Sequence, residues 1–380
     1  MCRAAAEPEP EAPRAVGLVD LNTASLANAP VNAMASNFRI PATWKSSLSV
    51  DWTGLGTGWN VGGDFYYGFV QNSAIYKDLR IAQVGTLPDG RPRYAATGGS
   101  NTDLLLTNTN RGHSLVAVAR VDKSFDLGLS VGGSYTFQDV KDVASMNGTT
   151  GSGTYGQDAM VDPNQAAYGT SIYQVRHSWK MHLDFDHAFF GDNKTRFSLF
   201  GELRSGLPYS LTMNEAQAAS RGTVTGTAGT SNRFLLYVPT VNDTKVVFAD
   251  AATQSKFDSL VDRYGLGKYR GQILGKNTQR SPNWFKVDLH VDQEVPLPLV
   301  PAKVILFADM ENVLNFINRD WGALKQVTFP YLASVVTVSC VASPTNTCAQ
   351  YRYSGVADPS LVNQTRISLY ALRVGAKVRF

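Results

Sequence analysis

Residues 177–189 have the sequence His-Ser-Trp-Lys-Met-His-Leu-Asp-Phe-Asp-His-Ala-Phe. Apolar Trp179, Met181, Leu183 and Phe185 alternate with polar neighbours. Because successive side chains of a β-strand point to opposite faces, this period of two predicts a strand with one apolar and one heavily charged face.

The same alternation recurs along the chain. Residues 284–295 place Phe, Val, Leu and Val opposite Lys, Asp, His, Asp and Glu, and residues 370–380 alternate up to a final aromatic residue, Phe380. Further strands of similar length are expected at about 43–54, 57–70, 113–124, 128–140, 195–204 and 302–312. Together these segments make nine long strands.

The length of these strands indicates a membrane protein. Strands of soluble proteins average about five or six residues, whereas a tilted strand that crosses a bilayer needs about nine to eleven. We therefore predict an all-β fold, an antiparallel transmembrane β-barrel.

The connections between the predicted strands alternate in length. Short links lie at 54–58, 123–127, 191–194 and 296–301, and long ones at about 71–112, 141–174, 205–282 and 313–364. Outer-membrane barrels join strands by short periplasmic turns and longer extracellular loops. We expect long structureless loops outside the cell.

Nine strands are an odd number, whereas complete bacterial barrels have an even number. We therefore expect residues 41–380 to form an incomplete outer-membrane β-barrel domain. Residues 1–40 are expected to be an irregular remnant of a preceding barrel loop. An open sheet would leave an unpaired edge in lipid, so we do not expect the chain to insert stably by itself.

Composition and charge exclude several other classes. The 380 residues are 43% hydrophobic and carry a formal charge of +4, with scattered Lys and Arg, so no nucleic-acid partner is expected. No apolar run approaches the roughly 18–20 residues of a spanning helix. Residues 1–20 lack the apolar core of a signal peptide, so we expect either an intracellular protein or a missing start. Cys2 is assigned no role.

Cys340 and Cys348 flank a Pro-Thr-Asn turn between strand-like segments. This spacing favours a loop disulfide, which would imply an oxidising compartment. Two free thiols are the alternative, and a zinc site is disfavoured because no His or third Cys lies nearby in the sequence.

Several phrases, in order, carry a family resemblance: Pro41-Ala-Thr-Trp-Lys45, Leu87-Pro-Asp-Gly-Arg-Pro-Arg-Tyr94, Tyr269-Arg-Gly-Gln272, Gln293-Glu-Val-Pro296, Ala308-Asp-Met-Glu-Asn-Val-Leu-Asn315 and Asp320-Trp-Gly322. The chain resembles the C-terminal part of a TonB-dependent outer-membrane receptor of the Oar-like group, and the resemblance covers most of its length.

This resemblance implies a barrel of about twenty-two strands, closed by a plug and powered through a TonB box, in the outer membrane of a Gram-negative bacterium. Neither plug nor box is recognised in the sequence, so we expect a transporter fragment that is inactive alone. The implied partners are outer-membrane lipid, the barrel-assembly machinery, the TonB complex through the missing plug and box, and an unknown small-molecule, peptide or carbohydrate ligand. The alternatives are a passive, self-associated porin-like channel and a soluble all-β binding module or adhesin.

The last strand resembles the insertion signal that the barrel-assembly machinery recognises. The residues that carry this resemblance are Phe380 together with Val378, Ala376 and Val374 at alternate positions before it. An ordinary amphipathic C-terminal strand is the alternative.

No catalytic, cofactor or metal site is expected, and the chain is not expected to be an enzyme. His177, His182 and His187 are five residues apart, so successive ones face opposite sides of a strand. Asp184 and Asp186 share a face with Lys180 but are more typical of a charged lumen wall than of a glycosidase pair.

Three other segments receive structural interpretations. Residues 222–229 are glycine-rich without the context of a phosphate loop and are expected to be a mobile loop. Residues 257–264 predict a short helix that packs on the barrel rim, with Phe257, Leu260, Val261 and Tyr264 on one face. Asn312, Asn315 and Trp321 end the penultimate strand; we favour a structural role over one in the aromatic belt of the membrane interface.

Overall fold

A computed structural model describes residues 29–99, 101–144, 148–297, 302–341 and 348–379. All nine predicted long strands form in it, with small shifts at most of their ends; the largest is a longer β3. They are β2 (Ala42–Trp52), β3 (Trp59–Asp78), β7 (His113–Ser124), β8 (Leu129–Asp142), β10 (His177–Phe190), β11 (Asn193–Arg204), β20 (Trp284–Pro296), β21 (Lys303–Glu311) and β26 (Ala371–Arg379).

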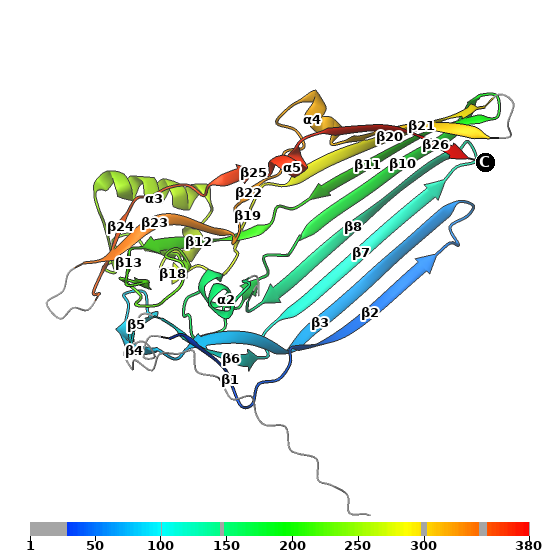
Figure 1. Cartoon of the computed structure of the whole chain (residues 1–380). Helices are drawn as coiled ribbons and strands as arrows, with labels where there is room; N and C mark the ends of the chain where they lie inside the picture. The colour runs from blue at the N-terminus through cyan, green and yellow to red at the C-terminus, as the bar shows by residue number, and fades with distance from the viewer. Residues whose placement is uncertain (1–28, 100, 145–147, 298–301, 342–347, 380) are drawn as a thin grey trace, which may run out of the picture.

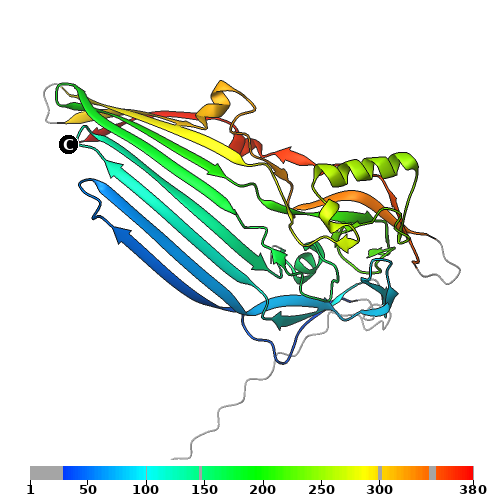
Figure 2. The ribbon, with the colours of Figure 1, turned by 180° about the vertical axis from the view of Figure 1, so that it is seen from behind.

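These strands form one antiparallel sheet in the order β2-β3-β7-β8-β10-β11-β20-β21-β26. The short turns lie at one end of the sheet, where β26 also ends, and the long connections lie at the other end (Figure 1). The sheet is curved but open: β2 and β26 lie at its opposite margins in both views (Figure 2). Within the described residues, β2 pairs only with β3, and β26 only with β21.

The pairing register sorts the side chains into an apolar face and a charged face. Met181 lies directly opposite Gly133 on one side and Gly201 on the other, while Asp184 lies opposite two serines on the other face. The apolar face is unusually exposed, with Leu48 65% and Val374 71% accessible. Large aliphatic side chains at this exposure suit a surface that meets lipid rather than water.

Aromatic side chains border the apolar face at both ends. Trp52, Trp59 and Phe125 lie near the short turns, and Trp44 and Phe69 lie near the long connections. Trp44 and Trp52 on one strand are separated by roughly 26 Å at 3.3 Å per residue. This matches the band of about 25 Å between the aromatic girdles of outer-membrane barrels.

The long connections do not form the structureless loops that the sequence predicts. They fold together, at the end of the sheet opposite the short turns, into what we call the loop body (Figure 1). Its centre is a six-stranded sheet of β12 (Pro208–Glu215), β15 (Phe234–Leu235), β17 (Val246–Phe248), β19 (Gln279–Arg280), β23 (Leu332–Cys340) and β24 (Tyr351–Ser354). Because these strands come from different connections, local sequence does not reveal their pairing.

Helix α3 (Ala251–Arg263) belongs to the core of the loop body. Asp250 caps its N-terminus by accepting a 2.7 Å hydrogen bond from the Thr253 amide. Phe257, Leu260 and Val261 are buried, as their shared face predicts, but they pack in the loop-body core rather than on the barrel rim. The helix is also longer than predicted.

The glycine-rich segment at residues 222–229 is packed, which corrects the prediction of a mobile loop. Val224, Thr225 and Thr227 are buried. The buried Glu215 carboxylate accepts hydrogen bonds from the Val224 and Thr225 amides at 2.8 and 2.9 Å. Burial raises the pKa of Glu215, and the hydrogen bonds from Thr225 oppose that rise.

Smaller elements complete the described fold. They are β1 (Val31–Met34), β4 (Ile81–Thr86), β5 (Pro92–Ala96), β6 (Asp103–Thr109), α2 (Gly151–Gln157), β9 (Gly169–Thr170), β13 (Gln217–Ala218), β14 (Arg221–Gly222), β16 (Tyr237–Val238), η1 (Gly267–Tyr269), β18 (Gln272–Ile273), α4 (Val313–Ile317), β22 (Lys325–Val327), β25 (Leu361–Asn363) and α5 (Thr365–Ser368). None of the described helices is long and apolar enough to span a bilayer.

Strand β1 lies within the segment predicted to be irregular up to residue 40. It pairs in parallel with β6, with Val31 opposite Asp103. The side chain of Asp103 accepts a 2.9 Å hydrogen bond from the Val31 amide. The prediction of an irregular segment is corrected for these four residues, whose partner strand lies far along the chain.

Two turn glycines allow the register to be tested with a matched pair of variants. Gly128 and Gly191 both have positive φ, +84° and +61°. An added Cβ at Gly128 would lie 2.1 Å from the Asp186 carbonyl oxygen, whereas nothing lies within 4 Å at Gly191. Gly191→Ala should cost only the strain of a left-handed residue, about 1–2 kcal/mol.

Gly128→Ala should destabilise the folded protein more than Gly191→Ala, because a neighbouring strand must also move. The measurement is the urea midpoint of the detergent-folded chain. Equal midpoints for the two variants would show that the β7–β8 turn does not approach β10 as described.

Candidate functional site

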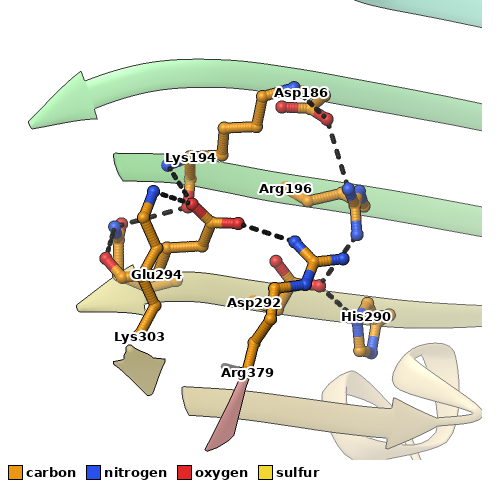
Figure 3. Close-up of polar contacts among 9 residues, drawn as sticks. Asp186, Lys194, Arg196, His290, Asp292, Glu294, Lys303 and Arg379 are labelled. Atoms are coloured by element: carbon orange, nitrogen blue, oxygen red, sulfur yellow. Dashed lines mark hydrogen bonds and ion pairs between the residues drawn. The ribbon is translucent and has the colours of Figure 1, made fainter. Parts of the chain in front are cut away.

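A cluster of ion pairs lies on the charged face at the end of the sheet with the short turns. Strands β10, β11, β20, β21 and β26 contribute to it, and Figure 3 shows most of its members. We call this cluster the charged wall. Its residues are Asp186, Lys194, Arg196, His290, Asp292, Glu294, Lys303, Asp309, Arg373 and Arg379.

One chain of contacts in the charged wall crosses five strands. Arg196 contacts Asp186 at 3.2 Å and Asp292 at 3.3 Å. Asp292 also lies 3.3 Å from the Nε2 atom of His290, whose Nδ1 atom contacts Asp309. Arg373 completes the chain at 2.8 Å from Asp309. Neighbouring strands are therefore linked by side-chain contacts between ionisable groups as well as by backbone hydrogen bonds.

A second set of contacts centres on Glu294. Its carboxylate lies 2.8 Å from the Lys303 ammonium and 3.4 Å from the Arg379 guanidinium. The Lys194 amide donates a 3.4 Å hydrogen bond to the same carboxylate. Glu294 thus joins the ends of β11, β20, β21 and β26 (Figure 3).

The charged wall has two layers. Its carboxylates lie close to the sheet, with the Asp292 and Glu294 side chains only 12% and 10% exposed. The Arg373 and Arg379 side chains are 74% and 69% exposed. Long basic side chains therefore cover a carboxylate layer, and the wall presents mainly positive groups to the space it borders.

The predicted polar residues on β10 are separated between the two faces. His182 lies on the charged face, 3.6 Å from Asp122 and 3.9 Å from Asp184. His177 packs on aromatic rings of the apolar face, and so does His187. The described residues contain no group of three or more His, Cys, Asp or Glu arranged to hold a metal ion. Asp186 takes part in the charged wall, whereas Asp184 contacts only His182 among the ion pairs described.

Asn312, Asn315 and Trp321 form a structured corner at the end of β21. Asn312 has a φ of +52° and is fully buried. Its amide side chain donates to the carbonyl oxygens of Gly322 and Ser368 at 3.1 and 2.7 Å. The Asn315 side chain donates to the carbonyl oxygen of Trp321 at 3.1 Å. These contacts give the motif a structural role in holding the chain as it leaves the wall.

The segment at residues 87–94 also stabilises the fold. Arg91 and Asp89 form an ion pair of 2.7 Å with both side chains fully buried. Arg91 donates to the Leu235 carbonyl oxygen at 2.8 Å, and the Tyr351 hydroxyl donates to Asp89 at 2.9 Å. Although burial disfavours its charge, Asp89 raises the pKa of Arg91. This buried pair joins three connections of the loop body.

The remaining predicted site residues lie around β23 and β24 and along β26. Cys340 and Cys348 are joined by a disulfide, which links the end of β23 to the segment before β24. Val374 and Val378 are exposed on the apolar face of β26. Phe380 and Cys2 lie outside the described residues, and recognition of β26 by the assembly machinery stays a prediction.

Sequence reasoning found the charged face but not the network on it. Arg196, Asp309, Arg373 and Arg379 each occupy a polar position of an alternating strand, but the alternation does not predict their contacts. The alternation gives the face of each side chain. Its partner depends on the register between strands, which a single sequence does not show.

A family model described as an outer membrane beta barrel domain matches residues 8–321 of the chain. No curated protein gives a significant match to the sequence.

Replacement of Asp292 tests whether the charged wall stabilises the sheet. Asp292→Asn should lower the free energy of unfolding by about 1–3 kcal/mol, because it removes charge-assisted contacts to Arg196 and His290. The half-exposed Asp184→Asn is the matched control and should change it by less than about 0.5 kcal/mol. Urea titration of the detergent-folded protein measures both. A loss for Asp292→Asn no greater than that of the control would show that the network contributes nothing to stability.

The disulfide can be tested by alkylation. Cys340 and Cys348 should resist a thiol reagent in the unfolded, unreduced protein and react after reduction, since disulfide sulfurs are not nucleophilic. Cys2 serves as the internal control, because we expect it to react in both conditions. Peptide mass spectrometry gives the result, and modification of Cys340 before reduction would contradict the bridge.

Proposed function

Because the chain belongs to the outer membrane beta barrel domain family, we propose that it forms part of the wall of a TonB-dependent outer-membrane transporter. The observation that carries this proposal is the charged wall, which lies on the face opposite the apolar one. In outer-membrane barrels the apolar face meets lipid and the polar face borders the lumen.

The two-layered charge favours a lumen that holds an acidic surface. A passive pore selects ions by rings of charged groups around open water. Here Arg and Lys side chains cover the carboxylates, so the most exposed charged groups of the charged wall are guanidinium and ammonium groups. Such groups suit binding of carboxylates on a plug domain or on an anionic solute.

The loop body supplies a folded surface on the side where ligands would arrive. Between α3 and residues 356–358 lies a groove of about 390 Å³, lined in part by Ser255, Lys256, Ser259, Arg263 and Asp358. Its polar lining suits a hydrogen-bonding ligand such as a peptide or carbohydrate. We propose this groove as the first contact site of the transported ligand.

The two edge strands of the nine-stranded sheet, β2 and β26, indicate how a closed barrel could be formed. Backbone groups in the hydrocarbon region need hydrogen-bond partners, and the free edges of β2 and β26 have none within the described residues. We propose that further strands of a transporter barrel pair with both edges. A self-associated channel would instead pair these edges with a second copy of the chain.

Photocrosslinking in the outer membrane distinguishes these assemblies. A photoreactive residue at Leu48 of β2 or Val374 of β26 should crosslink to strands of a plug-bearing barrel polypeptide, because edge partners lie within about 5.5 Å. The same residue at Arg373, which is exposed on the charged wall, should crosslink to the plug.

Leu199, on the lipid-facing side of a central strand, is the control position and should give no crosslink to another polypeptide, because both of its neighbouring strands belong to the same chain. Mass spectrometry identifies the products. Crosslinks from both edges to a second copy of the chain would overturn the transporter proposal in favour of a self-associated channel.

A further inference from the structure

The apolar face contains a groove that the lumen-based function does not use. It has a volume of about 470 Å³ and lies across β3, β7, β8 and β10, with Val121, Gly133, Tyr135, Trp179 and Met181 among its lining residues. Small-ligand sites have volumes of roughly 300–1,000 Å³. The groove is therefore large enough to hold part of a ligand.

The groove exists because one glycine interrupts a row of large side chains. Gly133 lies opposite Val121 on one neighbouring strand and Met181 on the other. An added Cβ at Gly201 would lie 3.0 Å from the Met181 side chain, whereas an added Cβ at Gly133 would meet no side chain within 4 Å. The Met181 side chain thus leans over Gly201, and the space at Gly133 stays open.

An aromatic ladder leads from the groove toward the loop body. The rings of Tyr135 and Trp179 pack with their centroids 5.0 Å apart, and the Tyr135 hydroxyl lies 2.8 Å from His177. The His177 ring packs on Phe137 at 5.6 Å. Arg176 lies over the Phe137 ring at 5.5 Å. Such rings suit the boundary between acyl chains and headgroups.

Positive charge gathers at the top of this ladder. The charges of Arg176 and Asp139 both act on Arg280, which lies in β19 of the loop body. The Nη1 atom of Arg280 is buried and has no hydrogen-bond partner in the described residues. Burial and the charge of Arg176 both lower the pKa of Arg280, and Asp139 only partly offsets them. An anion at this position would relieve that repulsion.

Lys141 extends the same cluster. It lies over the Tyr168 ring, whose hydroxyl is 3.3 Å from His113. His113 in turn lies 3.6 Å from Asp139. Lys141 and Asp139 lie two residues apart on one face of β8, and the charges of Asp139 and Arg176 both act on Arg280. The cluster lies just beyond the apolar band, at the depth where lipid phosphates are found.

We propose that this outward surface is a binding site for a phosphate-bearing membrane lipid of the leaflet nearest the loop body. Its phosphate contacts Arg176 and Arg280, with Lys141 beside them, and one acyl chain lies in the groove over Gly133. Guanidinium groups bind phosphate through paired hydrogen bonds, and the groove continues the surface that already meets lipid. The proposal requires only that the apolar face of the sheet meets lipid, so it does not depend on the transport proposal.

Native mass spectrometry of the full chain, folded in a nonionic detergent, tests the site. The probes are dipalmitoyl phosphatidic acid, dipalmitoylglycerol with the same acyl chains, and inorganic phosphate. Phosphatidic acid should bind at least about tenfold more tightly than either fragment, because only it occupies both parts of the site. Equal affinity for dipalmitoylglycerol would overturn the phosphate contact.

Arg176→Gln/Arg280→Gln should weaken phosphatidic acid binding about tenfold, as expected for lost charge-assisted hydrogen bonds. Arg352→Gln/Arg366→Gln removes two exposed arginines elsewhere and should leave binding unchanged. Heat-dependent gel migration verifies that each variant is folded. Wild-type affinity in the Arg176/Arg280 variant would refute the headgroup site.

A second variant tests the groove without touching charge. Gly133→Leu should fill it, since a Cβ there makes only an ordinary 3.5 Å contact with the Lys180 carbonyl oxygen. We expect this variant also to bind phosphatidic acid several-fold more weakly. Ala308→Leu, on the same face of β21, is the matched control. Undiminished binding in Gly133→Leu would refute the acyl-chain position.

Discussion

The pairing of backbone N–H and C=O groups is the constraint on which the rest of the structure depends. In the hydrocarbon region no water is present to hydrogen-bond with an unpaired peptide group. Every spanning strand must therefore form its backbone hydrogen bonds with adjacent strands. This requirement explains the continuous antiparallel ladder from β2 to β26. It also explains why side chains of opposite character can share a strand, because the ladder fixes which face each one occupies.

The charged wall depends on that ladder in turn. Asp186, Arg196, Asp292 and Asp309 come from four strands, and only their register brings them into contact. Each of these ion pairs includes at least one exposed side chain or lies at the polar surface, and an isolated pair of this kind would add little to the free energy of unfolding. Joined across neighbouring strands, they fix the relative positions of the strands near the short turns, while the long basic side chains stay available to whatever occupies the lumen.

The nine-stranded sheet could be predicted from the sequence because its signals are local. Alternation at residues 177–189 and 284–295 gave the strands and their faces, and the lengths of the links gave the two ends of the sheet. The loop body could not be predicted in this way. Its strands β12 and β23 pair in parallel although they come from different connections, and residues 222–229 are held by Glu215 and not by any pattern of their own. Pairings between the described cations of the lipid-facing surface, such as Arg176 beside Arg280, also depend on contacts between connections.

The hydrogen bond between Tyr351 and Asp89 has a consequence for biogenesis. It joins residues separated by 262 positions, so the loop body has a high contact order, whereas four of the eight neighbouring pairs in the nine-stranded sheet are joined by short turns. Closing so long a segment is entropically costly until the last strands arrive. The hairpins of the nine-stranded sheet are therefore expected to form first, and the loop body is expected to fold last. A polypeptide interrupted before β24 would keep its amphipathic hairpins but would leave the interior of the loop body open.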